Sequence, residues 1–257
     1  MKTITGHYDK YKSEKSLPSS TAVEELLAED DEDDTSSLKG RKRAPSMVVD
    51  DGDETATVPT NDADDAANKD LLKTESAKIK YKITVITEQT LPVSLAAFAN
   101  LFIEDGAANS YKTYHESVKD TNVVMSGWQS LASDSEKTRD IKFFKPVNLP
   151  GLASTRGVKL QKYKRFGNVG LLLSSSTRLE DVPAADTFSV DDTLEVTASG
   201  DSVVVSISFQ VTFLKSTFLR AMIEGPTNSE MKKWLNSFFE HLKAVCSANK
   251  ETSPKSA

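Results

Sequence analysis

The sequence predicts an α+β fold in which a curved antiparallel sheet of about six or seven strands wraps a long C-terminal helix. Two adjoining stretches of the 257-residue chain carry this prediction. From Val203 to Phe213 every second residue is apolar, and the alternating positions from 206 to 212 are polar, which indicates a strand with one buried face. The period then becomes helical, and from Met231 to Val245 the large apolar residues share one stripe. A helix of about twenty residues spans about 30 Å, enough to cross a whole sheet.

The start of this last helix is expected near Thr227. Gly225-Pro226 interrupts the helical pattern, Thr227 can accept hydrogen bonds from free backbone amides, and Glu230 can complete a capping box. Before the interruption, Phe218 and Met222 lie at helical spacing with their apolar neighbours and predict a shorter helical run.

The residues upstream indicate one strand, two short helices and a run of antiparallel strands. Consecutive strands with helices at both ends of the run indicate an α+β fold, and a sheet that wraps one helix leaves space for a cavity, as in START-like helix-grip proteins. The expected elements are a strand over 79–85, helices over 95–102 and 111–118, and strands over 122–128, 139–147, 158–166, 169–179 and 187–198.

Charge divides the chain into two parts. Up to Lys78 there are 19 acidic and 11 basic residues, and the remainder has 19 acidic and 21 basic residues. The first part lacks clusters of aromatic and β-branched residues, so it cannot bury enough apolar area to offset the entropy of ordering. We therefore expect a disordered acidic tail over 1–78, one START-type domain over 79–248 and a disordered C-terminus over 249–257. Within the tail, the basic block Lys39–Arg43 and Ser46 fit solvated disorder better than an import patch or a phosphorylation site.

Composition excludes several classes of function. The single cysteine, Cys246, excludes an internal disulfide framework and indicates a reducing compartment. No apolar run is long enough to span a membrane, and no signal-peptide core opens the chain, so a cytoplasmic location is expected. One cysteine and three scattered histidines give no metal-ligand spacing, and no glycine-rich phosphate loop occurs, so neither a metal nor a cofactor is expected. The basic residues have few interleaved aromatics, which disfavours nucleic acid as a partner.

No catalytic residue is assigned. His115 lies on the apolar stripe of the second short helix, where a histidine is more often a core residue than a catalyst. Asp192 shares the parity of its apolar neighbours, which would make it a candidate acid, but a bulge at Asp191-Asp192 is the favoured explanation. The Ser174–Ser176 run fits a pocket hydroxyl or a solvent-facing strand equally well.

Four segments, in register over roughly residues 82–247, resemble VASt domains. The resemblance implies a START-like module that binds sterol, as in Lam/Aster-type transfer proteins and plant relatives linked to cell death. The first matching segment, Asp120–Trp128, follows the second helix, and the next, Arg139–Val147, resembles the strand that leads to the lid loop of that family. The others are Leu179–Pro183 with Asp186–Val190, and Thr212–Leu219 with Ile223-Glu224.

The leading hypothesis is therefore a non-enzymatic protein that binds and transfers a lipid, with a sterol as the favoured ligand. An interaction module with a filled core and an enzyme acting on a small apolar substrate are the alternatives. Basic residues near the lid would hold it against anionic headgroups as a peripheral membrane contact. The expected lipid-binding residues are Phe98, Phe102, Tyr111, Tyr114, Leu171, Leu173, Val205, Ile207 and Phe209; the lid segment is Val147, Leu149, Pro150, Gly151 and Leu152; and the membrane-facing basic residues are Lys145, Arg156 and Lys159.

Overall fold

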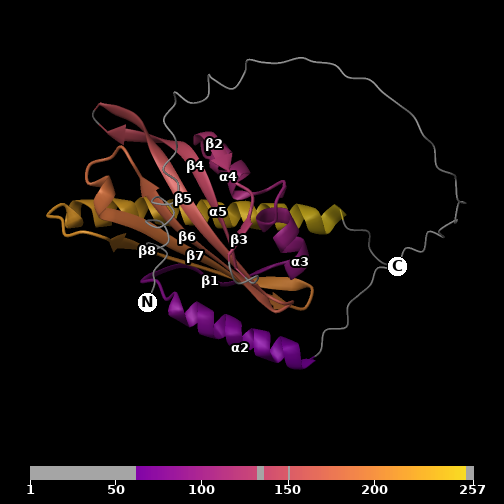
Figure 1. Ribbon diagram of the computed structural model, residues 1–257. Coiled ribbons are helices and arrows are strands. Elements are labelled where there is room, and N and C mark those ends of the chain that lie inside the picture. The colour runs from indigo at the N-terminus through magenta and orange to yellow at the C-terminus, as the bar shows by residue number, and fades with distance from the viewer. Residues whose placement is uncertain (1–61, 132–135, 150, 253–257) are drawn as a thin grey trace, which may run out of the picture. The chain divides into compact units, whose positions relative to one another are not determined.

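One antiparallel sheet organises the domain in the computed structural model, which describes residues 62–131, 136–149 and 151–252 (Figure 1). The strand order is β1-β8-β7-β6-β5-β4-β2, with the short β3 paired to β4. From β4 to β8 each strand pairs with the next one in the sequence, as expected for a meander. The strands are β1 (Ile83–Leu91), β2 (Thr121–Met125), β3 (Gln129–Ser130), β4 (Glu136–Leu149), β5 (Leu152–Phe166), β6 (Gly170–Leu179), β7 (Phe188–Ser199) and β8 (Ser202–Phe213).

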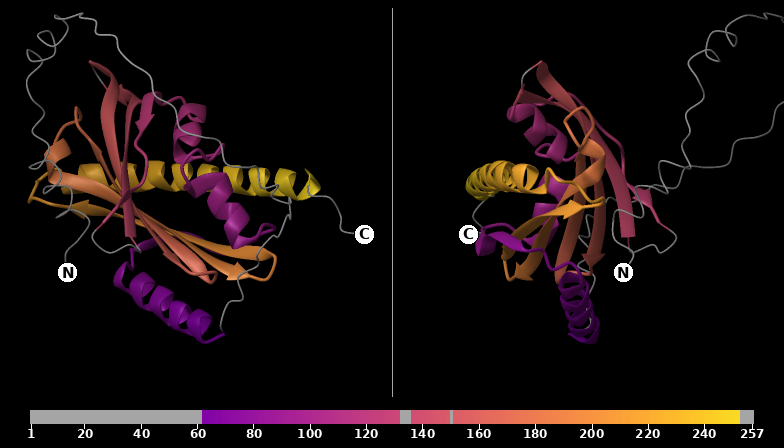
Figure 2. Two further views of the ribbon diagram at one scale, coloured as in Figure 1. Left: turned by 45° about the vertical axis from the view of Figure 1, so that its right-hand side comes forward. Right: turned by 90° about the vertical axis from the view of Figure 1, so that its left-hand side faces the viewer.

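The concave face of the sheet holds the long helix α5 (Arg220–Thr252), which crosses it in Figure 2. In β8 the apolar residues from Val203 to Val211 are buried at every second position, so one face of the strand lies in the core. Three short helices, α3 (Leu95–Phe98), the π-helix η1 (Ala99–Ile103) and α4 (Tyr111–Ser117), add their buried residues to the same core. The predicted α+β helix-grip fold is confirmed.

The helix α5 differs from its prediction because it runs without a break through Gly225 and Pro226. A proline inside a helix removes the hydrogen bond to the carbonyl four residues earlier, here that of Met222. Met222 is exposed, so water can hydrate that carbonyl, and packing of the later stripe stabilises the helix. Thr227 lies inside the helix and is not its cap. The helix also extends past residue 248, to Thr252, and residues 253–257 lie outside the described residues.

The first strand begins later than predicted. β1 starts at Ile83 and continues to Leu91, past the end of the strand expected over 79–85. Two register shifts let it follow β8 along its length, from the pair Ile83–Phe209 to the pair Leu91–Val203. The backbone of Glu88 between them has φ +47°, a local distortion typical of bulged edge strands.

The predicted start of the domain at residue 79 is wrong, because a helix, α2 (Asp62–Lys78), packs on the sheet face opposite α5. Its Leu72 is 4% exposed and contacts Phe166 and Leu172 in a second, smaller apolar cluster. Gly170 makes room for this leucine, because a Cβ at position 170 would lie 2.5 Å from Leu72 Cδ2. The helix has too few apolar residues to form a core alone, and the sheet supplies the others. The rest of the expected tail, residues 1–61 with Ser46 and the charged blocks, lies outside the described residues.

Leu72→Ala should lower the free energy of unfolding by about 2–3 kcal/mol, because it removes a buried leucine from the smaller cluster. The matched control is Leu71→Ala, since the neighbouring leucine is 53% exposed, and it should change the value by less than about 0.5 kcal/mol. Urea denaturation of the full chain measures both. Equal effects of the two substitutions would mean that α2 does not pack on the sheet.

Candidate functional site

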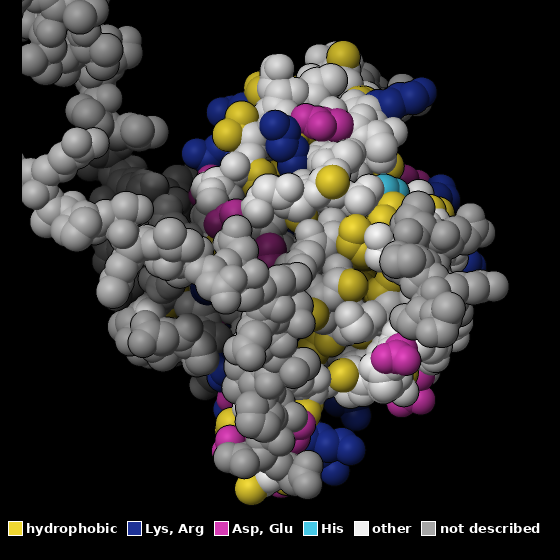
Figure 3. Space-filling view, turned by 90° about the vertical axis from the view of Figure 1, so that its right-hand side faces the viewer, with side chains coloured by type: hydrophobic (Ala, Val, Ile, Leu, Met, Phe, Trp, Pro, Cys, Tyr) yellow, Lys and Arg dark blue, Asp and Glu magenta, His cyan; other side chains and the backbone are white. Residues whose placement is uncertain are grey.

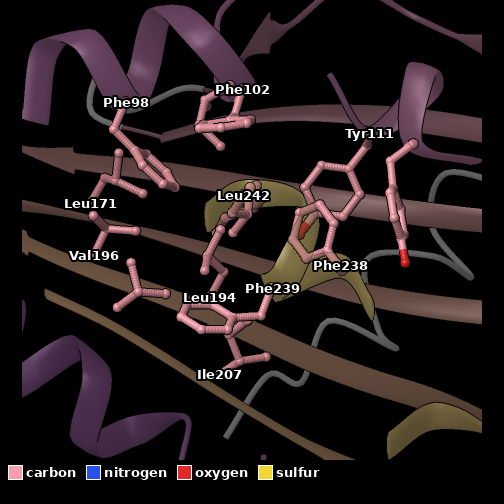
Figure 4. Close-up of a cluster of buried hydrophobic side chains, with 14 of the residues drawn as sticks. Phe98, Phe102, Tyr111, Leu171, Leu194, Val196, Ile207, Phe238, Phe239 and Leu242 are labelled. Carbon is pink, nitrogen blue, oxygen red and sulfur yellow. The ribbon is translucent and has the colours of Figure 1, made fainter. Parts of the chain in front are cut away.

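All nine residues predicted to contact a lipid lie in one buried apolar cluster between the sheet and α5. Figure 4 shows side chains from α3, η1, α4, the strands and α5 pointing toward one another. The ring centroids of Phe98 and Phe102 are 4.9 Å apart, and those of Tyr111 and Phe238 of α5 are 4.7 Å apart. The structure thus brings together the whole apolar set that the sequence predicted, from elements distant in the chain. The nine are Phe98, Phe102, Tyr111, Tyr114, Leu171, Leu173, Val205, Ile207 and Phe209.

A line of polar side chains crosses this apolar interior, and we call Arg139, Gln161, Ser175 and Asp192 the polar row. They are successive cross-strand partners on β4, β5, β6 and β7. Each of the four is at most 2% exposed. Arg139 Nε donates to Gln161 Oε1 at 2.7 Å, and Gln161 Nε2 donates to Ser175 Oγ at 3.5 Å.

The polar row faces α5, because side chains two residues apart along a strand share a face. The residues two positions along from its members belong to the main apolar cluster, namely Ile141, Tyr163, Leu173 and Leu194. Burying polar groups costs free energy unless they are hydrogen-bonded. The row is therefore an energetically costly exception on a mostly apolar face.

Lys159 also points into the interior, which corrects its predicted place on a membrane-facing surface. It is buried, and its Nζ lies 2.6 Å from Asp192 Oδ1. The same ammonium group lies 5.3 Å from the ring centroid of Trp234 and 5.8 Å from that of Tyr111. Lys159 shares the parity of Gln161, so the sheet turns it inward with the polar row.

No bulge occurs at Asp191-Asp192, which corrects the favoured sequence interpretation. Both residues stay in register with β8, so Asp192 faces inward and Asp191 faces outward. Asp191 accepts hydrogen bonds from the hydroxyls of Ser176, Ser189 and Thr212 at 2.6–3.1 Å. The residues of the Ser174–Ser176 run also alternate between the two faces of the sheet: Ser175 joins the polar row, and its two neighbours lie on the other face.

His115 forms a buried pair with Asp120 at the end of α4. Its Nδ1 lies 2.7 Å from Asp120 Oδ2, and its ring packs on Phe143 with centroids 4.5 Å apart. Burial lowers the pKa of His115, the hydrogen bond to Asp120 opposes this effect, and the nearby charge of Lys159 adds to it. Nε2 has no hydrogen-bond partner. The histidine is thus a neutral core residue at pH 7, as the sequence favoured.

The lid segment, which the sequence placed over Val147–Leu152, lies at the turn between two paired strands. β4 runs to Leu149 and β5 begins at Leu152, which pair with each other. Gly151 takes φ +77°, a conformation that suits glycine at a tight turn, and Pro150 lies outside the described residues. Val147 and Leu152 are half-buried.

The other two predicted membrane-facing residues lie at the surface. Lys145 is half-buried, with its Nζ 4.0 Å from Asp120 Oδ1. Arg156 is exposed and forms hydrogen bonds with Asp181 at 2.6–3.2 Å, which raises the pKa of the guanidinium. The hydrogen bonds of Arg156 lower the pKa of Asp181 to about 2.

Sequence reasoning missed two kinds of residue. The inward parity of Arg139 and Gln161 with Ile141 and Tyr163 was readable, but these two residues were not considered as interior ones. Phe218 and Met222 were placed only at helical spacing, and their exposure of 94% and 73% was not predicted. Helical spacing shows which residues share a face, not whether a partner covers that face.

Apolar side chains gather in the middle of the end of the domain that faces the viewer in Figure 3. This is the end toward which α3 lies in Figure 1.

Among the described residues, no helix is long and apolar enough to cross a membrane, and no group of three or more His, Cys, Asp or Glu could hold a metal ion.

The sheet, the helix it grips and the interior between them define a START-like helix-grip domain. The family model described as "VAD1 Analog of StAR-related lipid transfer domain" (VASt) matches residues 85–230, more than half of the chain. The chain therefore belongs to the VASt family, a family of START-like lipid-binding modules.

The chain is also similar to Protein VASCULAR ASSOCIATED DEATH 1, chloroplastic, of Arabidopsis thaliana. The two are 25% identical over 187 residues, which cover 69% of this chain and 31% of that protein. This chain thus aligns with about a third of that relative's length.

Lowering the pH should destabilise the fold through His115. Its pKa is lower in the folded protein, so the unfolded chain binds a proton first as the pH falls below about 6.5, and stability falls from there down to the folded pKa. His115→Gln should remove this dependence, which is at most about 1.4 kcal/mol per pH unit. Urea denaturation between pH 5 and 8 measures the difference in slope.

Burial also lowers the pKa of His241. Because His241 is present in both the parent and the variant, its contribution to the pH dependence cancels in that comparison. Parallel curves for the parent and His115→Gln would contradict the assignment of the pH dependence to the buried pair.

Proposed function

We propose that the protein binds a lipid between the sheet and α5 and transfers it between membranes, with a sterol as the favoured ligand. The observation that carries the proposal is the polar row at the centre of the apolar interior. An amphipathic ligand has one polar end and an apolar body, and this interior offers both kinds of contact. Membership of the VASt family supports lipid as the class of ligand.

Apolar contact would supply most of the affinity, at about 25 cal/mol for each Å² of apolar surface removed from water. The nine predicted residues would line the body of the ligand. A few polar groups then set its orientation. In a core that served only to stabilise the fold, apolar residues at the row's positions would avoid the cost of burying polar groups. This argues against an interaction module with a filled core.

The membrane contact would involve a surface that the sequence did not predict. Phe218 and Met222 are the most exposed large apolar side chains among the described residues. Lys215 precedes them and Arg220 lies between them in the sequence, but the two cations pair with Asp186 and Glu224, so the apolar side chains would supply most of the attraction to the membrane. We propose this site as the place where the domain meets a membrane in the cytoplasm, with Lys145 and Arg156 beside the lid segment as a second contact.

Two measurements test the proposed function. Native mass spectrometry of the protein purified from its own cells should show a lipid adduct, and the protein should carry dehydroergosterol between liposomes. We propose that the tip of the β4–β5 hairpin acts as the lid, so Leu149→Asp with Leu152→Asp should slow transfer about tenfold, a barrier change of about 1.4 kcal/mol.

The lid variant should keep its thermal midpoint, because a lid controls exchange and not folding. If the midpoint collapses, both leucines are core residues, and if transfer is unchanged, the hairpin is not the lid. Absence of any adduct together with no transfer would reject lipid binding as the function.

Phe218→Asp with Met222→Asp should weaken binding to anionic vesicles at least about tenfold, since inserting each side chain is worth about 1.5–3 kcal/mol. The control is Leu71→Asp with Val124→Asp, which makes the same charge change at two other exposed apolar residues. Co-sedimentation with phosphatidylserine vesicles measures both. An equal loss in the control would indicate a charge effect and not a membrane-inserting site.

A further inference from the structure

The basic residues next to the exposed apolar side chains at the start of α5 each have a carboxylate partner. Lys215 forms an ion pair with Asp186, which lies in the connection between β6 and β7. Arg220 Nε lies 3.6 Å from Glu224 Oε2, one helical turn further along α5, and its guanidinium carbon lies 4.7 Å from the ring centroid of Phe213. Neither cation is therefore left over for a headgroup.

The two cations beside the lid segment are paired in the same way. Arg156 meets two carboxylates, with Nη1 3.2 Å from Glu180 Oε2 and Nη2 2.6 Å from Asp181 Oδ1. Lys145 Nζ lies 4.0 Å from Asp120 Oδ1. All four basic residues named in the proposed membrane contact thus have at least one carboxylate within 4.0 Å.

This pairing cancels most of the attraction that the cations would exert on an anionic membrane. The partners of each pair lie well inside the Debye length of about 8 Å at physiological ionic strength, so a headgroup meets the carboxylate together with the cation. The carboxylates are charged at pH 7, because hydrogen bonds from Arg156 lower the pKa of Asp181 to about 2 and one from Lys215 lowers that of Asp186. Exposed pairs of this kind add little to stability, but they remove the excess of positive charge.

The apolar side chains on the same surface have no such partner. Phe218 is 94% exposed and Met222 is 73% exposed. Exposed apolar groups mark contacts with proteins or membranes, and a protein partner would need a separate pocket for each protruding side chain. The fluid interior of a bilayer accepts both without a matching shape. The gain from removing their apolar surface from water does not depend on the charge of the headgroups.

We propose that the surface formed by Phe218, Met222 and the ion pairs beside them docks on membranes that carry no net charge, such as phosphatidylcholine bilayers. This inference rests on the proposed function and names the kind of membrane that the domain serves. Insertion of the two apolar side chains supplies the affinity. The paired charges keep the surface hydrated without giving anionic membranes an advantage.

The test is co-flotation of the full chain with phosphatidylcholine vesicles and with phosphatidylserine-rich vesicles, at low and at high salt. The two affinities should agree within about twofold, and salt should change neither by more than that, because no net charge is available for screening. Binding to phosphatidylserine at least about tenfold tighter than to phosphatidylcholine, and lost at high salt, would overturn the inference and leave the membrane contact standing. Absence of binding to either vesicle would reject both, while the search for a lipid adduct tests ligand binding separately.

Asp186→Asn with Glu224→Gln removes the carboxylate partners of Lys215 and Arg220. The affinity for phosphatidylserine-rich vesicles should then rise at least about tenfold and become salt-dependent, while that for phosphatidylcholine stays the same. Asp201→Asn with Glu88→Gln is the control, because it makes the same charge change at exposed residues away from this surface. An equal rise in the control would show that these ion pairs do not face the membrane, and the assigned surface would be wrong. The comparison on the parent protein decides the kind of membrane even if the variants do not fold.

Discussion

The packing of α5 against the concave face of the sheet is the contact on which the other elements depend. Phe238 and Leu242 of the helix are almost fully buried against residues such as Phe209 of the sheet. This contact requires each strand from β4 to β8 to present an inward set of side chains, and α3, η1 and α4 complete the enclosure. Since the helix covers the middle of the sheet, a residue's parity along its strand decides whether it is interior.

The polar row departs from the rule that such an interior is apolar. Burying it costs free energy, which the bonds from Arg139 to Gln161 and from Lys159 to Asp192 only partly offset. Departures from local consistency of this kind are expected at functional sites. The lipid-binding family and the polar row therefore support the same functional proposal from independent directions.

The apolar lining was predictable because alternation along a strand is a local property. Val205, Ile207 and Phe209 follow one another at period two, and the structure buries all three. The same parity rule pointed Asp192 inward, although a bulge was then favoured, and it would have placed Lys159 inside as well. The membrane-facing prediction for Lys159 was wrong because charge was read as a sign of exposure. The structure shows that pairing with an acidic residue across the sheet makes burial possible.

By itself the sequence determined the order of the main elements from β1 onward, the gripped helix and the apolar residues of the interior, since these depend on periodicity. Only the tertiary structure decided which residues from distant parts of the chain contact one another. Leu72 of α2 is buried because Gly170 on a distant strand leaves room for it, and Phe218, just before α5, is exposed because none of the described elements covers it. Arg139 meets Gln161 and Trp128 through strand pairing and a loop contact. Such contacts join residues far apart in the chain, so no local pattern can specify them.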